Sequence, residues 1–400
     1  MKIVFFSPAW PHGQNGIITY VRNVTRAMQE QGHEVSVLTF DGRESIGGER
    51  VVPVTLGGAG TLAGFLQKIL RRLPVGQDDW REPALALAKE LRRLRSTHGV
   101  DVFEMEETFG LCGAVAESVD VPVVARLHGP YFLNGIYESA DGRLDEDRLR
   151  REGEAIRKVA AVTSPSRQVV EATREYYGLE RRMSVIPNPV PASPDAPTWS
   201  IDGSEPGTIL FVGRTDGRKG GDIVLRVFER LLRNRPGLRL HFVGPERGFA
   251  DAPPGVAWAE YVDANLAPAT RQQITYHGPL QPDEISSLRM KCRVTLVFSR
   301  YENHPLVCAE ALAAGCPLVA TNVGGIPEIV EHEKTGLLAS ADDLDDLTGQ
   351  VNRLLADPEL GARLGSAGRQ FCLEHLQPSV VASRTVELYR HVLAGNSPGK

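Results

Sequence analysis

Short apolar segments alternate with amphipathic ones along most of the chain. Residues 2–6 are largely apolar, residues 17–31 carry apolar side chains at helical spacing, and residues 34–40 are again rich in apolar side chains. A strand, a helix and a second strand in this order are typical of a parallel sheet with buried strands. The same alternation predicts further helices over residues 85–95, 144–159 and 167–177, and further strands over residues 100–105, 121–127 and 160–163.

The alternation stops at residues 187–197, which read PNPVPASPDAP. Proline has no backbone N–H and a fixed φ, so this segment builds neither a helix interior nor a central strand, and we interpret it as a linker between domains. After it the pattern restarts and then becomes helical from residue 342 onward. It predicts strands over residues 208–212, 238–243, 274–277, 294–298 and 318–321, and helices over residues 220–233, 282–291 and 305–314.

These elements predict an α/β fold with two Rossmann-like, doubly wound parallel-sheet domains facing across a cleft. We place the domains at residues 1–190 and 205–378, and we expect a C-terminal helix at about residues 379–396 to pack back on the first domain. Four hundred residues with 42% hydrophobic content also exceed what one core usually organises. Ligands of open α/β sheets bind at the carboxyl ends of the strands, so the residues just after strands are the candidates for chemistry.

The charge and composition of the chain limit the classes of partner that it is expected to bind. The 45 basic and 50 acidic residues give a net charge of −5 without a long basic run, which argues against a nucleic-acid surface. Basic clusters at Arg71–Arg72 and Arg92–Arg95 recur beside leucines at helical spacing. They indicate solvated helix faces or, alternatively, a peripheral contact with a membrane near an acceptor lipid.

The location follows from what the sequence lacks. The apolar run after Met1 reaches Pro8 too soon for a signal peptide, and no segment approaches the roughly 18 apolar residues of a membrane span. We therefore expect a cytoplasmic protein with at most peripheral contact at the inner face of the membrane. The five cysteines, an odd number without a CxxC pair, indicate buried reduced thiols.

Two loops follow predicted strands and precede helices. Residues 11–16, PHGQNG, can bring backbone N–H groups close to an anion or a sugar hydroxyl, but they lack the GxGxxG spacing of a nicotinamide or flavin site. Residues 213–220, GRTDGRKG, place Arg214 and Lys219 on one loop. An arginine fork and a lysine point charge suit a diphosphate whose charge grows as its bond to a sugar breaks. A solvated basic turn is the alternative.

The segment from Ser299 to Gly315 is the most informative. Pro305 is expected as the first helical residue, which leaves the N–H groups of Leu306 and Val307 available to a phosphate. Glu302 precedes the helix and Glu310 lies roughly 7 Å along it, at about 1.5 Å per residue, so one ligand can touch both carboxylates. For Glu302 the alternative is a cap or a loop ion pair. Glu310 has apolar neighbours, so a buried carboxylate there requires a partner.

The pair Glu302 and Glu310 in RYENHPLVCAEALAAG resembles the EX7E signature of retaining GT-B glycosyltransferases, especially family 4. The glycine-rich loop after the first strand, a strand that ends in Leu127-His128-Gly129, the GR…KG loop and the C-terminal helices are similar to that family as well. The resemblance implies a GT-B fold and an enzyme with two partners, a nucleotide-sugar donor and a hydroxyl acceptor such as a sugar, a glycolipid or a small metabolite.

The resemblance also implies roles for individual residues. Arg214 and Lys219 hold the donor diphosphate and act in catalysis, Glu310 holds the ribose hydroxyls, and Glu302 holds the transferred sugar. The other positions it assigns are the backbones of Asn303 and His304 at the sugar, His128 facing the sugar as a catalytic residue, Leu280 lining the nucleobase, Leu306 and Val307 at the phosphate, and Gly13, Gly16 and Gly213 where the backbone approaches the donor.

Departures from the family pattern leave the donor open. Asn303, His304 and Pro305 follow Glu302 where the family often has Gly and Phe, which leaves one fewer backbone donor and adds a polar wall. We favour a UDP-sugar over a GDP-sugar, carrying a hexose or an N-acetylhexosamine. Pro187-Asn188-Pro189 replaces the PNG-type turn of the family, so its role here is reduced to stiffening the hinge.

No metal or other cofactor is expected. The two DxD matches, Asp145–Asp147 and Asp343–Asp345, fall at predicted helix starts, where acidic side chains interact favourably with the helix dipole without a metal. Arg214, Lys219 and a helix N-terminus can supply the positive charge instead. No nucleophile stands out, so the working hypothesis is front-face transfer, in which the departing phosphate oxygen helps to deprotonate the acceptor hydroxyl.

The acceptor side consists of candidates only. Glu104, Glu106 and Glu107 end a predicted strand and either bind a polyol or amino-bearing acceptor or are solvated, and Tyr131 and Phe132 are candidate stacking surfaces for a sugar ring. The favoured function is a hexosyltransferase of bacterial glycan, glycolipid or glycosylated-metabolite synthesis. A nucleotide-sugar epimerase or sugar phosphorylase of the same fold and a noncatalytic nucleotide-sugar-binding protein are the alternatives, and a Rossmann oxidoreductase ranks last.

Overall fold

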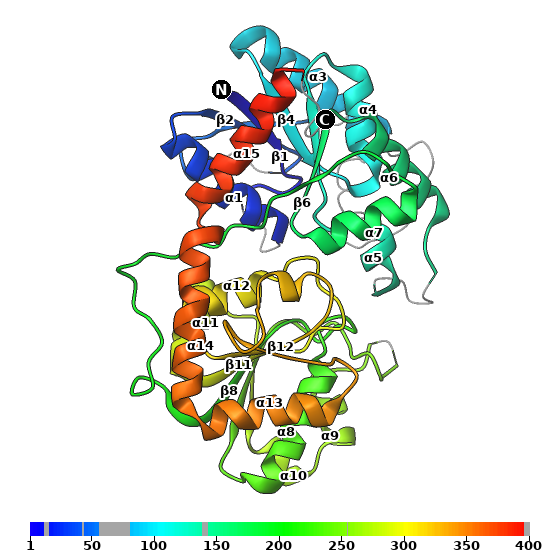
Figure 1. The fold of residues 1–400 in the computed structure, drawn as a ribbon. Helices are drawn as coiled ribbons and strands as arrows, with labels where there is room; N and C mark the ends of the chain where they lie inside the picture. Colours follow the sequence, from blue (N-terminus) through cyan, green and yellow to red (C-terminus); the bar gives the residue numbers. More distant parts are fainter. Residues whose placement is uncertain (12–15, 42–43, 56–80, 138–142, 254, 396–400) are drawn as a thin grey trace. The chain divides into compact units, whose positions relative to one another are not determined.

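The chain forms two compact units, each built on one parallel sheet (Figure 1). The computed structural model describes residues 1–11, 16–41, 44–55, 81–137, 143–253 and 255–395. Unit 1 consists of Met1–Pro189 with Pro378–Lys400, and unit 2 consists of Val190–Gln377. Residues 191–204, which the sequence prediction leaves between the two domains, and Val190, which it gives to the first, therefore belong to unit 2. The sheets of seven and six parallel strands confirm the predicted pair of Rossmann-like α/β folds.

The sheet of unit 1 has the strand order β3-β2-β1-β4-β5-β6-β7. Its central strands are nearly all buried because helices cover both faces, which is why they read as continuous apolar runs. The strands are β1 (Lys2–Phe6), β2 (Glu34–Thr39), β3 (Arg50–Pro53), β4 (Val102–Glu106), β5 (Val123–Arg126), β6 (Ala161–Ser164) and β7 (Ser184–Val185). The helices are α1 (Gly16–Glu30), α3 (Arg81–His98), α4 (Leu111–Ser118), α5 (Tyr131–Asn134), α6 (Glu146–Lys158), α7 (Arg167–Tyr177) and α15 (Pro378–Leu393).

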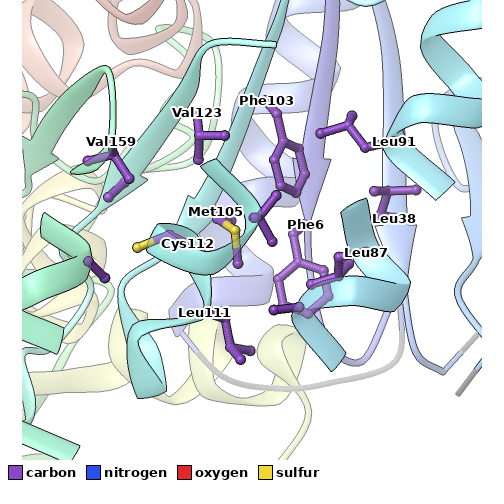
Figure 2. Close-up of a cluster of buried hydrophobic side chains, with 14 of the residues drawn as sticks. Phe6, Leu38, Leu87, Leu91, Phe103, Met105, Leu111, Cys112, Val123 and Val159 are labelled. Atoms are coloured by element: carbon purple, nitrogen blue, oxygen red, sulfur yellow. The ribbon is translucent and has the colours of Figure 1, made fainter. Parts of the chain in front are cut away.

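Two hydrophobic clusters lie on the two faces of this sheet. On one face, side chains of α3 and α4 such as Leu87, Leu91 and Cys112 pack against Phe103 and Met105 of β4 (Figure 2). On the other face, α1 packs with α15. The C-terminal helix thus belongs to unit 1, and the side chain of Gln31 binds its first turn through the carbonyl of Ser379 at 2.8 Å.

Glu104 joins α1 and α15 to the sheet. Its side chain is 2% exposed, and its two carboxylate oxygens accept hydrogen bonds from the hydroxyls of Tyr20 and Tyr389, both at 2.8 Å. Burial raises the pKa of Glu104 above its ordinary value, although the charge of Arg126 and the two tyrosine hydrogen bonds oppose that rise. The structure gives Glu104 a structural role inside unit 1 in place of the acceptor contact or solvated position that the sequence suggested.

The linker is bound to unit 1 at Asn188. This side chain accepts a hydrogen bond of 2.8 Å from Nη2 of Arg126, a buried residue at the end of β5, and the guanidinium of Arg126 also lies over the ring of Tyr20. Two residues later, Val190 belongs to unit 2, where its N–H donates to the carbonyl of Leu376. We interpreted residues 187–189 as stiffening the hinge through their two prolines. The hydrogen bond from Arg126 to Asn188 also fixes this turn to unit 1.

The sheet of unit 2 has the strand order β10-β9-β8-β11-β12-β13. Its strands are β8 (Glu205–Val212), β9 (Arg239–Val243), β10 (Ile274–Gly278), β11 (Cys292–Val297), β12 (Leu318–Thr321) and β13 (Leu337–Ala339). Its helices are α8 (Gly221–Asn234), α9 (Trp258–Asn265), α10 (Pro268–Arg271), α11 (Pro282–Lys291), α12 (Leu306–Ala313), α13 (Leu344–Ala356) and α14 (Pro358–Phe371), followed by a π-helical turn, Cys372–Leu376.

The structure tests the expected helix starts, the state of the cysteines and the absence of a membrane span. Asp145 and Asp343 are N-caps whose carboxylates accept backbone N–H groups of α6 and α13, so both DxD matches are helix starts, as expected. All five cysteines are buried and free, also as expected. Pro305 is the N-cap of α12 with extended backbone and not its first helical residue, so that expectation was wrong by one position. In the described part of the chain, no helix is long and apolar enough to cross a membrane.

The contacts of Glu104 generate a prediction on stability. Tyr389→Phe leaves a buried carboxylate with one hydroxyl donor fewer, which should lower the local free energy of unfolding by about 1–3 kcal/mol. Amide hydrogen exchange in α1 and α15 measures this loss. Tyr176→Phe is the control because that tyrosine is half exposed. Equal exchange in the two variants would contradict the assigned role of Glu104.

Candidate active site

The loops after β8 and β11 form the candidate site in unit 2. The two strands are parallel neighbours, with Thr295 of β11 opposite Leu210 of β8. Their carboxyl ends therefore lie at the same edge of the sheet, and the loop of residues 213–220 approaches the loop of residues 298–305. The sequence-predicted cations and carboxylate are carried on these two loops.

Lys219 and Glu302 form an ion pair between the two loops. Nζ of Lys219 lies 2.5 Å from Oε1 of Glu302, and Oγ of Ser299 donates to the same oxygen at 2.8 Å. The Glu302 carboxyl is 4% exposed, and burial alone would raise its pKa. The charges of Lys219 and Arg218 and the two hydrogen bonds outweigh burial and hold the pKa of Glu302 below its ordinary value, so the group stays ionised.

Two glycines permit the close approach of these loops. Gly220 has φ of 70°, and a Cβ there would lie 1.8 Å from the carbonyl oxygen of Phe298. Gly324 has φ of 53°, and a Cβ there would lie 2.1 Å from the carbonyl oxygen of Glu302, which also accepts the N–H of Gly325 at 2.8 Å. Any larger residue would push the backbone that carries Glu302 away from Lys219.

The remaining cations of the first loop are Arg214 and Arg218. Arg214 pairs with Asp216 of its own loop, Nη2 to Oδ2 at 2.5 Å, and both side chains are partly exposed. Arg218, which the sequence prediction did not include, lies near enough for its charge to lower the pKa of Glu302. The three cations Arg214, Arg218 and Lys219 exceed the two carboxylates Asp216 and Glu302 that pair with them, and this excess of positive charge favours an anionic ligand.

Glu310 has the partner that its position requires. Oε2 of Glu310 on α12 accepts a hydrogen bond of 2.9 Å from Nη2 of Arg289 on α11. The side chain of Glu310 is 41% exposed, so it is a partly open carboxylate and not the buried one that the apolar neighbours suggested. Leu280 packs in a small apolar cluster with Ile285 and Leu288 of α11.

The start of α12 completes the edge of the sheet in unit 2. The helix begins at Leu306, so the first-turn N–H groups of Leu306 and Val307 lack partners within the helix. Asn303 and His304, which precede the helix, are 8% and 7% exposed. Their backbone, together with Glu302, forms a continuous segment between β11 and the helix.

The candidate residues of unit 1 surround the loop after β5. The N–H groups of His128 and Gly129 donate to the two carboxylate oxygens of Glu107, at 3.0 and 2.8 Å. The ring of His128 meets the ring of Tyr20 edge to face, and its pKa lies well below the ordinary value because of burial and then the charge of Arg126. His128 is therefore a neutral imidazole at neutral pH.

The acidic candidates of unit 1 hold the backbone. Burial, and then the charge of Glu152, raises the pKa of Glu107 to about 8. Glu106 is buried, accepts the hydroxyl of Thr108 at 2.9 Å and has a pKa raised to about 6 by burial. Both carboxyl groups are thus buried and make contacts within unit 1, which contradicts a solvated position, and their contact with an acceptor stays a prediction.

The aromatic candidates are also engaged within the unit. The guanidinium of Arg148 lies 3.9 Å from the centre of the Tyr131 ring, and Phe132 is stacked on Tyr176 at 4.3 Å. One face of each ring is thus covered. Gly16 is exposed at the start of α1, and Gly13 lies outside the described residues.

Sequence reasoning missed three positioning groups. Glu152 accepts the N–H groups of Phe109 and Tyr131, Arg289 pairs with Glu310, and Arg300 joins the two loops of unit 2. Arg300 and Asp222 are 78 positions apart, and no local spacing relates them. One sequence signal could have indicated this pair. Asp222 lies on the apolar face of a predicted helix, and a buried carboxylate there requires a cationic or hydrogen-bonding partner.

Two parallel sheets, with a cation loop (residues 213–220) and a carboxylate loop (residues 298–305) at the strand ends of the second, give the chain the fold of the GT-B class of glycosyltransferases. The sequence model Glycosyltransferase Family 4 matches residues 14–193, and the model Glycosyl transferases group 1 matches residues 201–371. The chain belongs to this family of glycosyltransferases, as the sequence resemblance predicted.

Individual relatives carry different functional names. The chain is 29% identical over 371 residues to a D-inositol 3-phosphate glycosyltransferase of Acidothermus cellulolyticus, across 87% of this chain and 80% of that relative. It is 27% identical to a glycogen synthase of Mycobacterium tuberculosis, across 69% of this chain and 64% of that relative.

Solved structures share the fold over almost the whole chain. Sucrose-phosphate synthase of Thermosynechococcus elongatus has a TM-score of 0.77 at 21% identity, with 99% of this chain and all of that chain covered. The Anabaena protein HepE, in complex with UDP-glucose, has a TM-score of 0.71 at 18% identity, with 98% and 99% covered. At these identities the likeness shows the fold alone.

The raised pKa of Glu107 predicts a pH dependence of stability. The folded protein holds a proton that the unfolded chain releases above the ordinary value of 4.5, so this contribution is complete at low pH and is lost as the pH rises toward about 8. In that window stability should fall with a slope approaching about 1.4 kcal/mol per pH unit. Urea unfolding across the window, with Glu107→Gln as the non-titrating comparison, measures the slope. The same slope in both proteins would exclude Glu107 as its source.

Proposed function

We propose that the protein transfers a hexose or N-acetylhexosamine from a nucleotide diphosphate sugar to a hydroxyl acceptor, with retention of configuration and without a metal. The observation that carries this proposal is the ion pair of the partly buried Lys219 with the buried Glu302 at the carboxyl edge of the second sheet. One group suits a diphosphate and the other suits sugar hydroxyls, and they lie within one hydrogen bond of each other.

The donor is proposed to lie along this edge. Lys219, Arg214 and the backbone at Gly213 bind the diphosphate, and the first turn of α12 adds its free N–H groups. Glu310 exchanges its bond with Arg289 for the ribose diol, and Leu280 lines the nucleobase. Glu302 and the backbone of Asn303 and His304 bind hydroxyls of the sugar. A UDP-sugar is favoured, which agrees with the UDP-glucose held by the similarly folded HepE.

The charge state of Glu302 favours front-face transfer. A carboxylate that is paired with Lys219 and hydrogen-bonded to Ser299 is stabilised as an anion and is a weak nucleophile. We therefore propose that the bond between the anomeric carbon and the diphosphate breaks while the acceptor oxygen bonds to the same face. The acceptor proton passes to the departing phosphate oxygen, and Lys219 and Arg214 stabilise the diphosphate charge in place of a metal.

The acceptor is proposed only as a hydroxyl compound. The relatives named above act on different acceptors, an inositol phosphate in one case and a glycogen chain in another, so their names do not fix the acceptor here. His128 is a neutral imidazole at the end of β5 and is proposed to face the transferred sugar. Because the nearby carboxylates are engaged within unit 1, hydrogen bonds from neutral groups are the more suitable contacts with an acceptor.

A panel of UDP-, GDP- and ADP-sugars tests the donor. A ligand at 100 times its dissociation constant stabilises its protein by about 2.7 kcal/mol, so a bound donor should give a clear thermal shift. Release of nucleotide only when an acceptor is present distinguishes transfer from epimerisation or phosphorolysis. A shift without turnover for any acceptor would favour a noncatalytic binding protein, and a flat response to the whole panel would contradict the proposal.

Removing the cation gives a sharper prediction. Lys219→Ala should reduce turnover by about 100-fold or more, because one charged donor to the leaving group is lost and Glu302 is left buried without its partner. Lys334→Ala is the control, since that lysine is exposed and pairs only with Glu331 in the described structure. Steady-state rates of the two variants test the role of Lys219. Rates of the unchanged protein with and without a chelator test metal independence. A rate that disappears with the chelator would overturn metal independence, and an inverted product seen by NMR would overturn retention.

A further inference from the structure

We propose that Arg300 is a positioning residue that holds the cation loop, residues 213–220, in the conformation that binds a diphosphate. This inference rests on the proposed function, because it concerns how Lys219 is presented to the donor. Arg300 itself lies one residue beyond Ser299, on the loop that carries Glu302.

Arg300 makes contacts at three points on the other loop and its helix. Its backbone N–H donates to the carbonyl of Arg218 at 2.7 Å, and Nη1 donates to the carbonyl of Gly217 at 2.9 Å. The guanidinium also forms a bidentate pair with Asp222 in the first turn of α8, at 2.9 Å from Nη1 and 2.5 Å from Nη2. Three donors of one residue therefore fix the segment directly around Lys219.

The two halves of the cation loop have different supports. The first half is tied to the loop after β9, since Gly213 donates to the carbonyl of Val243 and Thr215 to the carbonyl of Pro245. The second half carries Arg218 and Lys219 and is tied to the loop after β11 through Arg300. Arg300 thus holds the cation loop to the carboxylate loop through backbone carbonyls of the cation loop. Lys219 and Glu302 join the same two loops through their side chains.

The charge of Arg300 matters as much as its hydrogen bonds. Asp222 is fully buried, and Arg300 is the cation that neutralises it in the described structure. Without the guanidinium, this carboxylate would attract Arg218 or Lys219, which lie close to it in the chain, and would withdraw them from the diphosphate. Lysine cannot replace arginine here, because a point charge cannot make the fork to Asp222 and reach Gly217 as well.

The test compares R300K and R300A with R293K and R293A. Arg293 is another arginine of unit 2, more deeply buried than Arg300 and at the start of β11, where Nη2 donates to the carbonyl of Ser204, so it controls for loss of a guanidinium inside the unit. We expect R300K to raise the dissociation constant and KM of the nucleotide sugar by about tenfold or more, which corresponds to about 1.4 kcal/mol, with a smaller change in kcat. R293K should lose stability and keep the donor KM.

Chemical rescue separates positioning from folding. Free guanidinium ion at a few millimolar should restore part of the donor affinity of R300A, because it can occupy the position beside Asp222, and it should not improve R293A. If R300A does not fold, R300K gives the same comparison of KM against kcat. A wild-type donor affinity in the Arg300 variants, with stability alone reduced, would overturn the role of Arg300. Failure of the wild-type protein itself to bind any nucleotide sugar would instead overturn the proposed function.

Discussion

The ion pair between Lys219 and Glu302 is the interaction on which the site of unit 2 depends. A carboxylate that is 4% exposed pays a large desolvation penalty unless a cation and hydrogen-bond donors surround it. Lys219 and Ser299 supply these contacts, and the loops after β8 and β11 must approach closely for them to form. Gly220 and Gly324, which have positive φ, permit that approach. Arg300 joins the two loops through its hydrogen bonds.

Unit 1 uses its charged groups differently. Glu104 fastens two helices to the sheet, and Glu107 and Glu152 accept backbone N–H groups of the loop that carries His128 and Tyr131. These carboxylates determine the shape of the loop and do not present free charge. Unit 2 has ion-paired cations at its strand ends, whereas the loop after β5 in unit 1 carries the neutral imidazole of His128.

Most of the long helices and strands and the main site residues could be predicted from the sequence. The elements and contacts that were missed are short or join distant parts of the chain. The bounds of α7, α11 and β12 agree with the predictions to the residue, because a cap, a proline or a glycine marks an end of each element. The short elements α4, α10 and β13 were missed, since one or two turns of helix or three residues of strand carry too little periodicity. Lys219 and Glu302 were found from their positions just after predicted strands, and the family motif then implied their roles. Their supports were not found, because Arg300 with Asp222 and Arg289 with Glu310 become neighbours only when the sheet brings separate loops together.

The most direct measurement of the central claim is the structure of the protein bound to a nucleoside diphosphate. We expect diphosphate oxygens within hydrogen-bond distance of Lys219 and Arg214, with the ribose hydroxyls on Glu310 in place of Arg289. We also expect the carboxylate of Glu302 to stay ionised and to face the side on which a sugar would extend. A nucleotide bound elsewhere, with the Lys219–Glu302 and Arg289–Glu310 pairs unchanged and no contact to the cation loop, would contradict it.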